Sequence, residues 1–291
     1  MNRIKGILYA AVSSSTFGLA PFFSITLLLA GFSAFEVLSY RWGVASIVLI
    51  VFGWLSGCNF RLAGKDWGVV FLLSLLRAVT SFSLIIAYQN IASGVASTIH
   101  FMYPLAVALA MMFFFREKKS LLVILAVLMS LLGAALLSLG ELEAKSGNTM
   151  VGLVAACVSV FSYAGYIVGV RTTRAVQINS TALTCYVMGL GTIFYLIGAY
   201  CTSGLQLVSD GYTWLIILGL ALPATAISNI TLVQAIKYAG PTLTSILGAM
   251  EPLTAVIGVF VFKELFTVNS AVGIILILLA VSIVVFRRQK S

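Results

Sequence analysis

The sequence predicts an all-α, polytopic membrane protein of ten transmembrane helices, built as two inverted five-helix repeats. Three observations predict it: a composition suited to lipid, ten apolar runs of membrane-spanning length, and an internal repeat. Of the 291 residues, 61% are hydrophobic and 9% are charged, and the mean hydropathy is +1.13. Soluble domains are about half apolar and about a quarter charged. A chain with so few charges cannot cover a water-facing surface, so we expect lipid to be its solvent.

The apolar runs are separated by short connections that contain charges and turn residues. A transmembrane helix needs roughly 20 mostly apolar residues. The ten runs lie near residues 6–29, 35–55, 67–88, 94–115, 121–140, 150–170, 181–202, 212–235, 241–262 and 268–286. The connections between them leave no room for a soluble domain.

The basic residues predict the orientation, because cytoplasmic connections collect Lys and Arg. With the N-terminus inside, 13 of the 17 Lys and Arg residues fall in cytoplasmic segments and only Lys145 and Lys263 fall outside. The other two, Arg41 and Arg77, lie within predicted helices. We therefore expect both termini in the cytoplasm of a multi-pass protein of the cell (inner) membrane. The same asymmetry accounts for the net charge of +9, so no nucleic-acid partner is needed to explain it.

An internal repeat appears when the sequence is displaced by 146 residues. The pairs that coincide include Gly6 and Gly152, Ala10 and Ala156, Ser13 and Ser159, Phe17 and Tyr163, Tyr40 and Tyr186, and Gly94 and Gly240. With small gaps, Pro104-Leu105 also falls on Pro252-Leu253. Residues 1–145 and 146–291 therefore read as two repeats. Because each has an odd number of helices, the second must cross the membrane in the opposite direction, as is common in secondary transporters.

Several short motifs, in order along nearly the whole chain, resemble a known family. They are Ser13-Ser14-Ser15-Thr16-Phe17-Gly18, Ser39-Tyr40-Arg41-Trp42, Ser93-Gly94 through Tyr103-Pro104, Arg116-Glu117, Tyr163-Ala164-Gly165-Tyr166 with Arg171, Glu251-Pro252 and Lys263-Glu264. In these motifs the sequence is similar to the EamA-type transporters of the drug/metabolite transporter superfamily. The resemblance implies a ten-helix inner-membrane carrier, usually an exporter of metabolites or amino acids. It does not name a substrate.

Arg77 is the first candidate site residue, because a charge at a helix centre costs about 2.5–3.5 kcal/mol on insertion scales and usually faces a cavity or a partner. Arg77, Thr80, Ser81, Leu84 and Tyr88 follow one helical face. Two interpretations stay open. Arg77 binds a substrate anion, since guanidinium matches carboxylate geometry, or it forms a structural ion pair with Glu251.

Glu251 is the second candidate, as a proton-coupling or gating residue. It precedes Pro252, and a proline frees the carbonyl four residues before it. An opened helix with a carboxylate suits a coupling proton or an amine. The alternative is a general role in gating or helix packing. Pro104, the repeat partner of Pro252, is a candidate for gating on the same ground.

Other polar and aromatic residues are predicted to line the same cavity. His100, Tyr103 and Pro104 share a helical face, and histidine titrates near neutral pH, although a hydrogen-bonded spacer is the alternative. Asn229 lies in the inner half of its helix. Two stripes matched by the repeat complete the set: Ser13 and Phe17 in the first half, and Tyr163 with Tyr166 in the second. Close helix packing is the alternative for these stripes.

The residues favour a carrier over other classes of membrane protein. We expect a secondary active transporter that exports small metabolites by alternating access, with proton coupling open. A uniporter or channel-like facilitator, and a membrane-embedded enzyme, are the alternatives. With one histidine and one deep carboxylate, the chain offers no metal site and no catalytic set, and Gly-x-x-x-x-Gly-Lys is absent. We therefore expect no enzyme activity, no cofactor and no metal. The expected partners are a small-molecule solute and the bilayer, for a monomer or a dimer.

Overall fold

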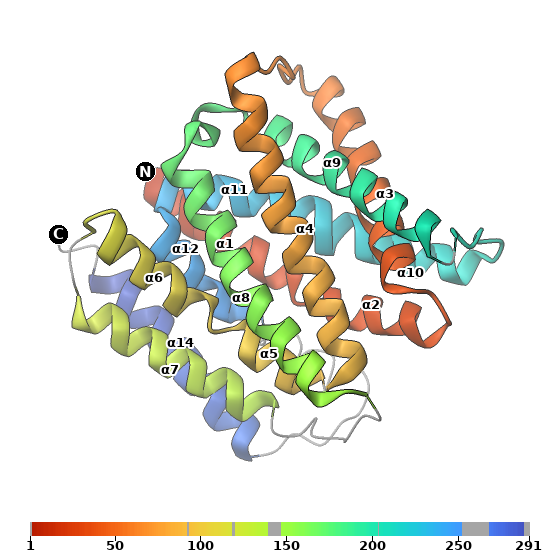
Figure 1. The fold of residues 1–291 in the computed structure, drawn as a ribbon. Coiled ribbons are helices and arrows are strands. Elements are labelled where there is room, and N and C mark those ends of the chain that lie inside the picture. Colours follow the sequence, from red (N-terminus) through yellow and green to blue (C-terminus); the bar gives the residue numbers. More distant parts are fainter. Residues whose placement is uncertain are drawn as a thin grey trace.

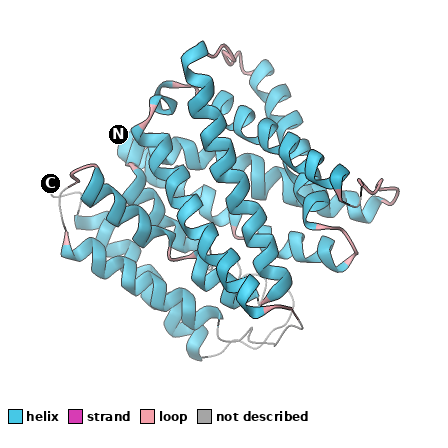
Figure 2. Ribbon diagram, viewed as in Figure 1, coloured by secondary structure: helices cyan, strands magenta, loops and turns pink. Residues whose placement is uncertain are grey.

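A computed structural model describes residues 2–91, 93–117, 120–138, 147–202, 204–251 and 268–287. In this part of the chain every regular element is helical (Figure 2). The helices are α1 (Asn2–Phe17), α2 (Ala20–Leu29), α3 (Ala34–Leu55), α4 (Trp67–Asn90), α5 (Ser93–His100), α6 (Tyr103–Phe114), α7 (Leu121–Ser138), α8 (Thr149–Thr172), α9 (Ser180–Cys201), α10 (Gly211–Ala221), α11 (Ser228–Ala239), α12 (Pro241–Leu247) and α14 (Val268–Arg287). The predicted all-α class is confirmed.

Within the described residues, seven helical stretches are long and apolar enough to cross a membrane. They are Arg3–Leu29, Ala34–Leu55, Gly64–Asn90, Val95–Phe114, Thr149–Thr172, Ser180–Cys201 and Gly211–Ala239. The predicted fifth and tenth helices correspond to α7 and α14. The predicted ninth begins as α12, but residues 252–267 lie outside the described part. The count of ten helices therefore stays a prediction.

Helices α3, α8, α9 and α10 begin at residues whose side chains cap them. Ser33 and Glu36 form a reciprocal capping box at the start of α3, which satisfies backbone N–H groups that have no partner in the first turn. Asn148, Asn179 and Asp210 accept backbone N–H groups at the starts of α8, α9 and α10. These caps explain why the predicted boundaries of four helices agree closely with the structure.

Prolines interrupt three of the predicted helices. A proline removes the hydrogen bond to the carbonyl four residues earlier, and its ring clashes with that carbonyl. Pro21 lies four residues after Phe17, where α1 ends, and Pro104 lies four residues after His100, where α5 ends. Pro223 lies in a π-helical segment, η4 (Leu222–Ile227), between α10 and α11. The breaks place Phe17 and His100 at the ends of half-helices.

The packing of the helices repeats across the two halves. Helix α1 packs along α11 and α4 packs along α8, while α3 packs along α9 and α7 along α14 (Figure 1). Exchanging the halves turns the α1–α11 contact into the α8–α4 contact and leaves the other two contacts unchanged. This pattern agrees with two repeats of inverted direction. The predicted boundary between residues 145 and 146 lies outside the described residues.

Two helices of the first half each carry a buried arginine. Helices α3 and α4 carry Arg41 and Arg77, which are 4% and 1% exposed. Around them, α1, α8 and α11 contribute a mixture of aromatic and small polar side chains. The outer helices α7 and α14 lie to one side and pack on each other (Figure 1). The fold thus surrounds two buried arginines with helices from both halves.

Candidate functional site

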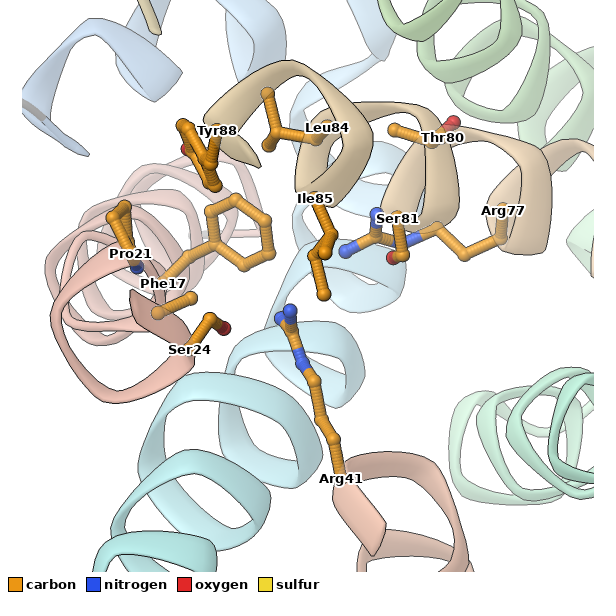
Figure 3. A pocket seen from close by; sticks show the side chains of 11 residues that line it. Phe17, Pro21, Ser24, Arg41, Arg77, Thr80, Ser81, Leu84, Ile85 and Tyr88 are labelled. Carbon is orange, nitrogen blue, oxygen red and sulfur yellow. The ribbon is translucent and has the colours of Figure 1, made fainter. Parts of the chain in front are cut away.

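A small cavity lies where α1, α2, α3 and α4 meet. Its lining residues are Phe17, Ala20, Pro21, Ser24, Arg41, Arg77, Thr80, Ser81, Leu84, Ile85 and Tyr88. The polar stripe predicted on α4 therefore faces a cavity, including Ser81 and Tyr88 (Figure 3). The volume of about 20 Å³ is enough for roughly one water molecule. In this arrangement the cavity is closed to anything larger.

Arg77 occupies the deep end of the cavity. Its Nε donates a hydrogen bond to Oδ1 of Asn229 at 3.0 Å, and its Nη1 is buried without a hydrogen-bond partner. The guanidinium carbon lies 5.2 Å from the ring centre of Phe17, 4.9 Å from Tyr163 and 5.9 Å from Tyr166. Aromatic faces stabilise a cation electrostatically. Three aromatic rings therefore surround the guanidinium group of Arg77, and its Nη1 has no hydrogen-bond partner among the described residues.

Arg41 approaches the same cavity from α3. Its Nε donates to Oγ1 of Thr225 at 2.7 Å and its Nη2 to the carbonyl of Ala224 at 3.4 Å. Its guanidinium carbon lies 5.6 Å from the ring centre of Phe17. Figure 3 shows the ends of Arg41 and Arg77 pointing into one space. The sequence marks Arg41 as a charge within a helix, but not that its side chain reaches this cavity.

The π-helical segment η4 and the first turn of α11 together hold both arginines. Thr225 donates its hydroxyl to the carbonyl of Leu220 at 2.7 Å, which leaves a lone pair for Arg41. Asn229 donates from Nδ2 to the carbonyl of Thr225 at 2.7 Å, which turns its Oδ1 toward Arg77. A π-helix shifts the backbone register by one residue. Periodicity in the sequence does not reveal such a shift, so Thr225 was not a predicted site residue.

An aromatic cluster connects this cavity to the fourth predicted helix. Tyr163 stacks on Phe17, with ring centres 6.5 Å apart, and meets Tyr103 edge to face at 4.6 Å. The ring of His100 stacks on Tyr163 at 5.4 Å, and its Nδ1 lies 2.9 Å from Oγ of Ser159. The repeat-matched residues Phe17 and Tyr163, which the sequence predicts to face one cavity, therefore meet.

Tyr103 and Glu251 meet across the two halves. The Tyr103 hydroxyl donates to Oε1 of Glu251 at 3.3 Å. Both residues precede the prolines that the repeat matches, Pro104 and Pro252, so they occupy equivalent positions. The hydrogen bond therefore joins the two repeats at equivalent positions. Pro252 itself lies outside the described residues, and Pro104 lies in the first turn of α6.

The sequence allows an ion pair between Arg77 and Glu251, but their recorded hydrogen bonds go elsewhere. Arg77 donates to Asn229 and Glu251 accepts from Tyr103. The two groups still interact electrostatically at longer range. Ser13 is also turned away from Arg77, since its hydroxyl donates to the carbonyl of Ser228 at 2.8 Å. Among the described residues, no three His, Cys, Asp or Glu side chains gather as metal ligands.

Two inverted helical halves around a buried, charged cavity are the architecture of a polytopic membrane transporter. The sequence profile of the EamA-like transporter family matches residues 4–139 and again residues 150–286. The chain therefore belongs to the EamA-like transporter family, within the drug/metabolite transporter superfamily. It is similar to a solved protein described only as "Crystal structure of protein", at 18% identity and a TM-score of 0.80, over 100% of this chain and 99% of the other. That likeness shows the fold. A comparison with curated proteins finds no match.

Proposed function

We propose that this protein is a secondary active carrier that exports small metabolites, such as amino acids or related compounds, by alternating access. The observation that carries the proposal is the closed cavity at Arg77. Its walls come from the first half, while Asn229, Tyr163 and Tyr166, which contact the arginine, come from the second. A site shared by two inverted halves is exposed to opposite sides as the halves rock.

The size of the cavity supports a carrier over a channel. A volume of about 20 Å³ holds roughly one water molecule, so a larger solute enters this cavity only after it widens. A channel-like facilitator would need a continuous path in its open state. A membrane-embedded enzyme is the remaining alternative, and the family consists of transporters, which favours solute movement as the activity.

Proton coupling is the finer part of the proposal. Glu251 and Tyr103 join the two halves by one hydrogen bond, and His100 lies next to Tyr103 with ring centres 5.4 Å apart. A carboxylate that gains and loses a proton would strengthen and weaken this link as the halves move. We propose Glu251 as the proton-coupling or gating residue, with both termini in the cytoplasm and the protein in the cell (inner) membrane.

The test is solute counterflow in proteoliposomes. A growth-protection and efflux screen with amino acids and toxic analogues first supplies a transported solute. The reconstituted protein should then show saturable uptake that is stimulated by unlabelled solute inside. Arg77→Gln should abolish the flux or raise the half-saturation concentration at least about tenfold, which corresponds to ~1.4 kcal/mol of lost binding. The matched control is Arg61→Gln, which removes an exposed arginine and should leave the flux unchanged.

Two results would contradict the proposal, the first its carrier mechanism and the second its placing of the solute path at Arg77. One is flux that rises linearly with concentration, together with single-channel currents in planar bilayers. The other is normal counterflow in Arg77→Gln, which would remove the cavity from the solute path.

A further inference from the structure

Two arginines share one buried cavity, and all their recorded hydrogen-bond acceptors are neutral. Arg41 donates to a threonine hydroxyl and a backbone carbonyl, and Arg77 donates to an asparagine oxygen. Charged side chains in a membrane protein usually pair with an opposite charge or face a path for ions or solutes. Neither arginine has a carboxylate among these acceptors, and the nearby Glu251 can offset at most one of the two charges, so the cavity carries an excess of positive charge.

The two guanidinium groups also act on each other. Their like charges are close enough to repel, and both lie against the same ring, that of Phe17. Repulsion in a buried site is relieved when an anion sits between the two cations, because water screens it poorly there. The arrangement is therefore most favourable with an anion present.

The Nη1 nitrogen of Arg77 marks where an anion would bind. Among the described residues, the buried Nη1 has no hydrogen-bond partner, on a side chain that is 1% exposed. An unsatisfied buried donor costs roughly 1–3 kcal/mol, and more when it is charged. Arg77 lines the cavity into which Arg41 also points (Figure 3). Oxygen atoms of a carboxylate or phosphate match the paired donors of a guanidinium.

We propose that this cavity selects solutes with a net negative charge, whose carboxylate or phosphate group bridges Arg41 and Arg77. The proposal rests on the proposed function in taking the cavity as the solute path, and it narrows the substrate class. In this proposal Arg41 binds the solute directly, as Arg77 does. Once the cavity widens to admit a solute, an acidic amino acid or a dicarboxylate compensates the two cations, whereas a neutral amide of the same shape leaves their charge uncompensated.

The inference is tested by binding, separately from transport. The purified full-length protein in neutral detergent is titrated with glutamate, succinate and inorganic phosphate at constant ionic strength, and Tm is measured. Glutamine and choline chloride are the matched controls of shape and of ionic strength. A bound anion should raise Tm in proportion to the logarithm of its concentration above Kd, by roughly 5–10 °C at a hundredfold excess over Kd. Glutamine should give no such rise over the same concentrations.

Variants locate the binding. Arg41→Gln and Arg77→Gln should each raise the half-saturation concentration of the effective anion at least about tenfold. Arg41→Lys and Arg77→Lys should retain part of the affinity, because they keep the charge but lose the paired donors. Arg61→Gln should behave as the unchanged protein. If the glutamine variants do not fold, the comparison of glutamate with glutamine on the unchanged protein still decides.

The proposal is overturned if no anion raises Tm, if glutamine and glutamate raise it equally, or if both glutamine variants bind the anion normally. Stabilisation by phosphatidylglycerol nanodiscs, but not by any soluble anion, would also overturn it and assign the charge to lipid. Anion binding without counterflow would support the anion site and contradict the carrier mechanism. Counterflow of a neutral solute without anion binding would support the carrier mechanism and contradict the anion site.

Discussion

Asn229 determines what Arg77 contacts in the closed cavity. Its Oδ1 accepts from Nε of Arg77 at 3.0 Å, and it is fully buried. Asn229→Ala removes this acceptor and should lower the free energy of unfolding by roughly 1–3 kcal/mol, because a charged donor loses its partner. Asn229→Asp supplies a carboxylate at the same place. We expect it to be more stable than Asn229→Ala in thermal unfolding, yet to bind anionic solutes at least about tenfold more weakly.

The reason is competition for one guanidinium. A built-in carboxylate satisfies Arg77 and cancels the charge that a solute would compensate. Asn59→Asp adds the same charge at an exposed position and serves as the control. Unchanged anion affinity in Asn229→Asp would show that Arg77 is not the group that holds the solute.

At the residue scale, the sequence predicts which groups are unusual better than what they contact. Arg77, His100 and Glu251 stand out because polar groups are costly in lipid, and each is buried in the structure. The matched stripes predict that Phe17 and Tyr163 face one cavity, and in the structure their rings stack on each other. The partner of Arg77 could not be predicted. Asn229 and Thr225 reach the arginines through a π-helix, whose register shift leaves no periodic signal.

At the element scale, α3 and α9 approach each other closely at Gly191. A Cβ built there would lie 2.0 Å from Cζ3 of Trp42, whose ring is 1% exposed. Gly191→Ala should therefore force the two helices apart and lower the free energy of unfolding by roughly 1–3 kcal/mol. Because Trp42 adjoins Arg41, anion binding should weaken as well. Thermal unfolding and the same anion titration check both effects.

Gly189→Ala is the matched control on the same helix. A Cβ there meets no atom within 4 Å, and alanine favours a helix interior over glycine by up to about 1 kcal/mol. This variant should be neutral or slightly more stable. Equal losses in the two variants would mean that the contact with Trp42 does not determine the effect, because the helix propensity of alanine favours both changes.

The sequence predicts a helix well where the evidence is the length of an apolar run, and less well where a proline interrupts that run. The second, third, sixth and seventh predicted helices agree with α3, α4, α8 and α9 within a few residues. The first, fourth and eighth are each divided near a proline. A proline marks a possible break, but packing decides whether the helix kinks, stops or forms a π-turn. Half-helix ends at Phe17 and His100 follow from that packing.

At the scale of the whole molecule, the scaffold is symmetric but its charge is not. The helix contacts exchange between the halves, whereas both cavity arginines come from the first half. By the 146-residue displacement, their equivalents in the second half are Val187 and Pro223. The first half thus supplies the cations and the second half supplies the acceptors that orient them. Rocking of the halves would separate the acceptors from the arginines and change their availability to a solute.

The orientation in the membrane is the remaining property of the whole molecule that a direct measurement can decide. The connection between α3 and α4, which contains Arg61, lies at the top of Figure 1. The connection between α8 and α9, which contains Arg174, lies at the upper left near the N-terminus, and residues 204–210 lie at the right. In a cysteine-free background, a membrane-impermeant maleimide added outside intact cells should label Leu207→Cys, whose native side chain is 85% exposed. It should spare Lys65→Cys until the cells are opened, because basic connections stay in the cytoplasm.

A second pair of variants, Lys145→Cys and Lys118→Cys, lies outside the described residues. Lys145→Cys should be labelled from outside, and Lys118→Cys should be labelled only after the cells are opened. Labelling of only the Lys65 and Lys118 variants from outside would reverse the predicted orientation, and labelling of Leu207 and Lys145 on opposite sides would contradict the inverted repeat.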